Sequence, residues 1–434
     1  MARGRIDIPP DLGGVSARRA IDAATLRDAE VTPADGDAIW RSVERLYRTG
    51  VHPAIGLCIR RRGHVVVEGA IGHQRGHGPA EPAAGAAVLA TPATPFGLFS
   101  ASKAITAMVI HLLVERGALR LDDPVAEYVP GFARHGKQGI TLAHLLCHRA
   151  GLPRVPGSFD EPEVLLDPAA CVARLCDARP TQAPGRRLEY HALAGGYLLG
   201  AVVRRATGRT LQEVIRGEIL DPLGFELMGY GVPPARERDV AVNYVTGSAM
   251  PFPLTWITRR ALGLTWAQAT DLSNDPRFYR RIIPSANVFG TANEASRFFE
   301  LLLRGGELDG KRVMEARTLR AARVETAYLE PDRVLVWPVR YGQGLMLGAP
   351  LISPFGPGLG SAFGHIGFMN IFCYADPERD LAVALMTSGK LLFDTHLPAL
   401  VNVLWQIARH CRPVRAKERR RTNREAGRRG EDLG

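Results

Sequence analysis

The stretch Phe99–Met108 places a serine and a lysine three residues apart at the start of an apolar helical segment. Turn-forming residues at 94–97 predict a loop before it, and the apolar run predicts a helix to about Gly117. On a helix, residues three apart lie on one face, one above the other. The hydroxyl of Ser100 is a weak nucleophile until a base removes its proton, and Lys103 is placed to be that base.

This interpretation requires the pKa of Lys103 to be lower than that of a free lysine. A free lysine titrates near ~10.4, so a base that works near neutral pH needs its pKa lowered by about three units. Burial beside a network of hydroxyl groups would have this effect. Because so short a motif also arises by chance, the interpretation depends on two further stretches of the chain.

Those two stretches carry a tyrosine and a glycine-rich strand. Tyr190 lies on a loop just before a helical segment, so its phenol can reach a cleft, where nearby cations would lower its pKa. His365, Gly367 and Phe368 lie at the entry of a predicted strand, where glycines let a substrate approach backbone N–H groups that can bind an oxyanion. Each feature alone is more typical of packing or of a bulge, so the chemistry depends on their combination.

The pattern of apolar residues predicts an α+β protein, because two hairpins are separated by a long helical middle and followed by a closing helix. We expect four parts: an irregular N-terminal arm at 1–34, a sheet domain formed by 35–150 and 293–411, a mostly helical inserted domain at 151–292 that carries Tyr190, and a basic, disordered tail at 412–434.

Composition is that of an ordinary globular protein, with 46% hydrophobic and 23% charged residues among 434. The longest apolar run, around 104–114, contains His111 and is too short to cross a bilayer. The first ten residues lack the apolar core of a signal peptide, so we expect a cytoplasmic protein without a transmembrane segment.

Of the net charge of +11, +5 lies in the tail, which has nine basic and four acidic residues from Arg412 onward. Such a tail could contact nucleic acid or anionic lipid. No aromatic residues are interspersed with its charges, which favours a solvated, disordered tail, and we expect no nucleic-acid partner. The sequence leaves the oligomeric state open.

The spacing of the cysteines and histidines gives little support for a metal site. The six cysteines form no CxxC pair, and their apolar surroundings predict buried free thiols. His144 and His148 are four residues apart and could share a metal, but the glutamate of a metalloprotease helix and a third ligand are missing. We therefore expect packing roles for both histidines and no metal.

Together, the three stretches resemble the serine β-lactamase-like hydrolases, a family that includes penicillin-binding proteins, class C β-lactamases and related carboxylesterases. Ser-x-x-Lys is a signature of this superfamily. The resemblance covers about residues 35–410 and implies an antiparallel sheet flanked by helices, an inserted helical domain and an active site between them. Five further stretches support it by order and spacing: 119–125, 140–152, 184–185, 290–292 and 305–310.

The resemblance also implies a role for each residue. Ser100 would be the acylated nucleophile, Lys103 its proton partner, and Tyr190 a second base that later activates the deacylating water. The oxyanion would lie on the backbone N–H groups of Ser100 and Phe368, just after the triplet that begins at His365 and ends at Gly367. The reaction would be acyl transfer in two steps, without a metal or an organic cofactor.

Departures from the family pattern bear on the substrate. Ala192 stands where penicillin-recognising members have the asparagine of Tyr-x-Asn, and His365-Ile366-Gly367 stands where they have Lys-Thr-Gly. A mostly neutral imidazole cannot replace an ammonium in holding a carboxylate. Both changes favour neutral esters with short or medium acyl chains, although Phe368 is bulky where a small residue is expected. The alternatives are an acyltransferase that uses an alcohol acceptor, a β-lactamase or peptidase, and a non-catalytic scaffold or binding protein.

Overall fold

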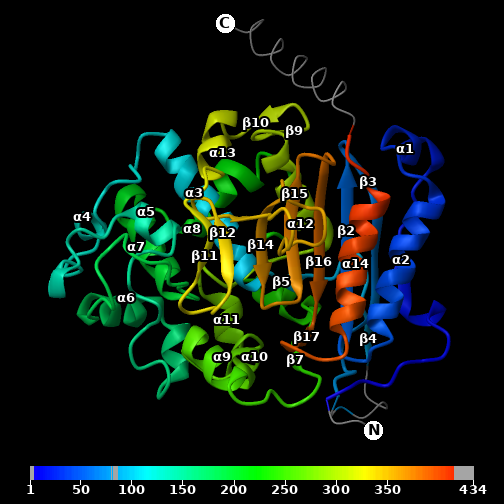
Figure 1. The fold of residues 1–434 in the computed structure, drawn as a ribbon, viewed down its shortest axis with the longest axis horizontal. Helices are drawn as coiled ribbons and strands as arrows, with labels where there is room; N and C mark the ends of the chain where they lie inside the picture. The colour runs from blue at the N-terminus through cyan, green and yellow to red at the C-terminus, as the bar shows by residue number, and fades with distance from the viewer. Residues whose placement is uncertain (1–3, 80, 82–86, 415–434) are drawn as a thin grey trace, which may run out of the picture.

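Two hairpins that are distant in the sequence meet in the centre of one sheet. The first consists of β2 (Ala54–Arg61) and β3 (His64–Arg75), and the second of β15 (Ile371–Asp376) and β16 (Leu381–Thr387). Strand β16 pairs antiparallel with β2 along its whole length. The first and last thirds of the chain therefore form one domain core. The computed structural model describes residues 4–79, 81 and 87–414 (Figure 1).

The sheet extends outward from this centre in the order β1-β3-β2-β16-β15-β14-β13-β12-β11, with β4 paired to β3. Neighbouring strands along this order are antiparallel. The remaining members are β1 (Ser16–Arg18), β4 (Val88–Leu89), β11 (Ala327–Pro331), β12 (Pro338–Tyr341), β13 (Met346–Leu347) and β14 (Phe363–Gly367).

Helices cover both faces of the sheet, so its central strands are buried on both sides. Helices α2 (Pro33–Tyr47) and α14 (Leu397–His410) lie side by side along one face (Figure 1). Helix α12 (Ala292–Leu303) packs on β2, β15 and β16. Helix α3 (Ser102–Glu115) contacts β14 and several smaller helices, which places its first turn between the sheet and the helical part of the molecule.

The helical part lies beyond the β11 end of the sheet and below it (Figure 1). Its helices are α4 (Val125–Tyr128), α5 (Leu142–Leu146), α6 (Pro168–Asp177), α7 (Ala194–Thr207), α8 (Leu211–Ile215), α9 (Leu254–Leu262), α10 (Trp266–Leu272) and α11 (Pro276–Arg280). Helix α13 (Ala316–Ala322) packs on α3. The short strands are β5 (Phe96–Gly97), β6 (Gly229–Tyr230), β7 (Tyr244–Val245), β8 (Val288–Gly290), β9 (Glu307–Leu308), β10 (Lys311–Arg312) and β17 (Gly389–Lys390).

The predicted α+β class, with an antiparallel sheet flanked by helices, is confirmed. The prediction of an irregular arm over 1–34 missed two elements, since β1 extends the sheet and α1 (Ala23–Asp28) is capped by the side chain of Asp22. Most of the predicted basic tail, residues 415–434, lies outside the described residues. The domain boundaries stay a prediction.

The six cysteines are free and buried, as the sequence predicted. Across the described residues, no helix combines the length and the apolar character needed to cross a membrane.

Packing between α2 and β3 provides a test of the fold. Trp40 on α2 is 2% exposed and lies against Gly69 of β3, where a Cβ would come within 2.6 Å of the indole ring. Trp40→Ala should lower the free energy of unfolding by about 3–5 kcal/mol, because it leaves a large cavity. The control is Trp405→Ala on α14, where the indole is 40% exposed and the expected loss is under ~1 kcal/mol. Urea unfolding of both variants measures the difference, and equal losses would contradict this packing.

Candidate active site

Ser100 lies in a short 3-10 turn, Phe99–Ala101, that leads directly into α3. Helix α3 is buried from Ser102 to Leu113, so its first turn is held inside the core rather than at the surface. The Nζ atom of Lys103 lies 3.1 Å from the Oγ atom of Ser100. The spacing read from the sequence therefore corresponds to a direct contact.

The amine of Lys103 is surrounded by neutral partners. Its Nζ atom donates to the carbonyl oxygens of Ala192, at 2.6 Å, and Ser285, at 3.2 Å. Burial holds the pKa of Lys103 well below its usual value of 10.5. An uncharged amine has two N–H groups and one lone pair. In that uncharged form the two carbonyls accept both N–H groups, and the lone pair faces the hydroxyl of Ser100 and can take its proton.

Tyr190 reaches the same hydroxyl from the loop before α7. Its O–H donates to the Oγ atom of Ser100 at 2.9 Å. The expectation that cations would lower the pKa of Tyr190 is wrong, since burial raises this pKa above its ordinary value. The physical reason is that burial of the phenol penalises its charged form, and the carboxyl group of Asp332 raises the pKa further. Tyr190 therefore acts as a hydrogen-bond donor in the resting site.

The third predicted stretch forms the end of β14. His365 is buried, its Nδ1–H donates to the carbonyl of Ile366 at 2.7 Å, and burial lowers its pKa to about 3. Its imidazole is neutral, as the sequence predicted. The ring centroid of His365 lies 6.5 Å from that of Tyr190. At Gly367, a Cβ would come within 2.1 Å of the carbonyl oxygen of Leu98, so only glycine permits this close approach.

Two backbone N–H groups of the described residues, near the contact between Gly367 and Leu98, are without a hydrogen-bond acceptor. Within the part of the chain that the structure describes, the N–H groups of Ser100 and Phe368 have no acceptor. Unpaired N–H groups in a largely buried place are uncommon and are costly unless a ligand or water takes them. These are the two groups that the sequence resemblance implies for an oxyanion.

A small apolar cavity of about 70 Å³ opens beside Ser100. Its walls combine the helical part of the molecule with the turn after β14, and no charged side chain lines it. The lining residues are Phe99, Ser100, Leu165, Leu166, Ala192, Leu193, Tyr197, Leu262, Leu264, Ala269, Leu272, Phe278, Ile283, Ala286 and Phe368. A cavity of this kind accepts a short hydrocarbon group next to the nucleophile.

Comparison with known proteins decides the family. A family model described as Beta-lactamase matches residues 41–401. The chain belongs to the Beta-lactamase family. It is accordingly a serine hydrolase of that family.

Relatives of the chain include esterases. Esterase/beta-lactamase LipL of Mycobacterium tuberculosis (strain ATCC 25618 / H37Rv) is 32% identical over 301 residues, which cover 67% of this chain and 68% of LipL. A penicillin-binding protein homologue from Caulobacter crescentus is 29% identical, with a TM-score of 0.70 over 86% of this chain and 97% of that chain. A family VIII carboxylesterase, 22% identical, has the same fold, with a TM-score of 0.72 over 87% of this chain and 98% of that chain.

Two histidines lie beside Tyr190: His148, for which the sequence predicted a packing role, and His191, for which it predicted none. The Nδ1 atoms of His148 and His191 are 3.1 Å apart, and the ring of His148 lies 4.7 Å from that of Tyr190. Burial lowers both pKa values, so the pair is neutral. The only signal for His191 was its place next to Tyr190. His144 instead accepts from the backbone N–H of Thr141 at the start of α5.

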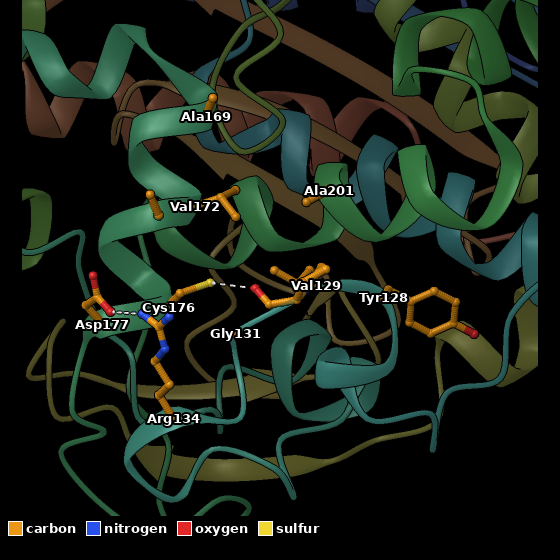
Figure 2. Close-up of a pocket in the computed structure, with 11 residues that line it drawn as sticks. Tyr128, Val129, Gly131, Arg134, Ala169, Val172, Cys176, Asp177 and Ala201 are labelled. Carbon is orange, nitrogen blue, oxygen red and sulfur yellow. Dashed lines mark hydrogen bonds and ion pairs between the residues drawn. The ribbon is translucent and has the colours of Figure 1, made fainter.

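A larger hollow of about 420 Å³ lies elsewhere, between α6, α7 and the segment after α4. Figure 2 shows its walls of small apolar side chains, with an ion pair between Arg134 and Asp177 at one side. Burial raises the pKa of its one thiol, Cys176. The hollow holds no activated nucleophile and is not the reaction site. Among the described residues, no group of three metal-ligating side chains comes together.

The buried amine leads to a prediction about stability. In the unfolded chain Lys103 titrates near 10.5, and burial lowers this pKa in the folded chain, so folding releases the proton at any pH between the two values. This cost grows as the pH falls from 10.5 toward the folded pKa, and Lys103→Met removes it. The stability of the variant relative to the wild type should therefore improve between about pH 10 and pH 7, whereas ester turnover should fall by roughly 10²–10⁴-fold.

Urea unfolding at both pH values and turnover of a p-nitrophenyl ester measure these effects. Lys311→Met on exposed β10 is the matched control and should change neither quantity appreciably. A relative stability of Lys103→Met that is the same at both pH values would contradict an uncharged Lys103.

Proposed function

We propose that this protein cleaves neutral carboxylic esters of short or medium acyl chains through a covalent acyl-Ser100 intermediate. The observation that carries the proposal is the contact between the Nζ atom of Lys103 and the Oγ atom of Ser100, made by an amine whose pKa burial lowers well below its usual value. An uncharged amine one hydrogen bond away is a base for a serine hydroxyl.

In the first step, the Oγ atom of Ser100 bonds to the ester carbonyl carbon as its proton moves to Lys103. The carbonyl oxygen becomes an oxyanion beside the free N–H groups of Ser100 and Phe368. The carbon–oxygen bond to the alcohol then breaks, and the alcohol leaves with the proton that the amine received. Loss of one such N–H donor typically costs ~10²–10³ in rate.

In the second step, water replaces the alcohol. A water molecule bonds to the acyl carbon as its proton passes to Lys103, and the bond to the Oγ atom of Ser100 breaks as that proton returns to the serine. Tyr190 stays protonated in the resting site, so its role is to stabilise the charge on Oγ and to pass protons between the amine and the leaving group. A permanent tyrosinate base is not required.

Three features of the site support neutral esters as substrates. The cavity beside Ser100 is apolar, Ala192 lacks an amide that would bind a polar acyl side chain, and the imidazole of His365 is uncharged. A carboxylate, which β-lactams and peptides present at this place, would find no cation among these groups. The names of the relatives LipL and the family VIII carboxylesterase agree with ester cleavage.

The first test is chemical labelling. A fluorophosphonate should add one phosphonyl group to the wild type, mapped to Ser100 by mass spectrometry, and Ser100→Ala should lose both the label and p-nitrophenyl butyrate hydrolysis. A label on another residue, or hydrolysis that survives Ser100→Ala, would overturn the proposal. Faster p-nitrophenol release on addition of an alcohol acceptor would indicate acyl transfer. Nitrocefin turnover equal to ester turnover would contradict the argument from Ala192 and His365.

The second test concerns the cavity. Ala286→Leu adds three carbons to a wall of the cavity, so kcat/KM for p-nitrophenyl butyrate should fall about tenfold or more relative to p-nitrophenyl acetate. The matched control is Ala173→Leu, which lines the larger hollow beside α6 and should leave this ratio unchanged. A ratio that changes only in the control would place the acyl group in the other hollow.

A further inference from the structure

Three aromatic rings from distant parts of the chain form a continuous stack beside Ser100. The ring of Phe368 lies 4.9 Å from that of Phe99, with 11° between their planes. The indole of Trp266 lies 4.1 Å from the ring of Phe368, at 10°. Phe99 precedes the nucleophile, Phe368 follows β14, and Trp266 begins α10. The stack therefore joins the turn of Ser100, the sheet and the helical part of the molecule.

The two inner rings belong to residues with unusual backbone conformations. Phe99 has a φ of +48° and Phe368 a φ of +43°, and Met369, next to Phe368, has a φ of +66°. This left-handed region favours glycine, and bulky residues occupy it only where their surroundings hold them there. A glycine at either position would be free of this strain. We therefore attribute the presence of phenylalanine at both positions to the stacking of the two rings.

These strained residues control the free N–H groups. The N–H of Phe368 is one of them, and the peptide that follows Phe99 carries the other, the N–H of Ser100. The close approach of Gly367 to the carbonyl of Leu98 brings the two backbone segments together. Stacking of Phe99 on Phe368 adds a second connection between the same segments, on the side of the cavity.

The stack has a support at each end. The Nζ atom of Lys390, which is buried and donates to the carbonyl of Thr387 at 2.6 Å, lies over the ring of Phe99, 4.5 Å from its centroid. At the other end, α10 begins with a capping box between Thr265 and Gln268, which fixes its first residue, Trp266.

We propose that Trp266 is a positioning residue for the oxyanion site, holding Phe368 against Phe99 so that the N–H groups of Phe368 and Ser100 point to one place. Trp266 does not line the cavity beside Ser100, so it acts through Phe368 and not on the substrate. This inference rests on the proposed function, since it concerns the oxyanion of that reaction.

One detail of Trp266 indicates which part of the side chain matters. Its Nε1–H is buried and has no acceptor among the described residues, although buried indole N–H groups usually have one. The side chain is thus present for its ring face and not for a hydrogen bond. A phenylalanine at this position should preserve the stack.

The experiment compares three variants with p-nitrophenyl acetate, whose acyl group is too small to depend on the cavity walls. Trp266→Leu should lower kcat by roughly 10- to 100-fold with KM within about twofold, because displaced donors lose contacts made mainly in the transition state. Trp266→Phe should stay within about threefold of the wild type. Trp256→Leu, which changes a 53% exposed indole on α9, is the matched control and should have no effect.

A transition-state analogue supplies the readout that a merely structural role would not change. Phenylboronic acid forms a tetrahedral adduct with the active serine, and its Kd should rise in Trp266→Leu by the same factor as kcat/KM falls. If kcat falls but the Kd is unchanged, or if Trp266→Phe is as slow as Trp266→Leu, the inference is wrong. If Trp266→Leu does not fold, Lys390→Met tests the other end of the stack with the same readouts, and wild-type kinetics in it would overturn the inference.

If the proposed function itself is wrong, the experiment gives a different result from those above. In that case the wild type itself would show no turnover dependent on Ser100. A wild type that hydrolyses the ester through Ser100, together with an unaffected Trp266→Leu, would reject the stack alone.

Discussion

An amine buried without a counter-ion is the constraint on which the site depends. Among the described residues, the Nζ atom of Lys103 meets two carbonyl oxygens, the hydroxyl of Ser100 and the ring face of Tyr190, and no acidic group offsets its burial. Each unit by which burial lowers a pKa corresponds to about 1.4 kcal/mol that favours the uncharged form. Burial in this fold thus favours the uncharged form of Lys103, which is the form that can act as a base. The other features of the site are consistent with an uncharged Lys103.

The architecture explains how the condition is met. Helix α3 begins inside the core, so Lys103, which lies in its first turn, cannot reach water freely. The carbonyls that accept from Lys103 come from the loop before α7 and from the segment before β8, both in the helical part of the molecule. The sheet contributes β14, whose end lies against Leu98. The base and the free N–H group that follows β14 are therefore brought together only when the sheet and the helical part are packed together.

The sequence alone predicts the central hairpins and the pairing of Ser100 with Lys103, because these features depend on local patterns and on a short motif. Alternation and turn residues are sufficient to place the two central hairpins, and the spacing of Ser100 and Lys103 is sufficient to predict that their side chains meet. The pKa of Tyr190 was predicted in the wrong direction, since it is set mainly by burial of the phenol, which spacing does not reveal. The pairing of His148 with His191 and the stack of Trp266 on Phe368 join segments that are distant in the chain, and no local signal marks such contacts.

The absence of charge around Ser100 also gives a reason for the strained backbone beside it. Burial lowers the pKa values of Lys103 and His365 and raises that of Tyr190, so burial works against a positive charge at any of the three before the reaction begins. The oxyanion is then stabilised mainly by the dipoles of the backbone N–H groups, whose effect depends steeply on distance and direction. A left-handed conformation costs about 1–2 kcal/mol for a residue other than glycine. That cost at Phe99 and Phe368 is small beside the ~2.7–4 kcal/mol that one well-placed oxyanion donor typically contributes to a transition state.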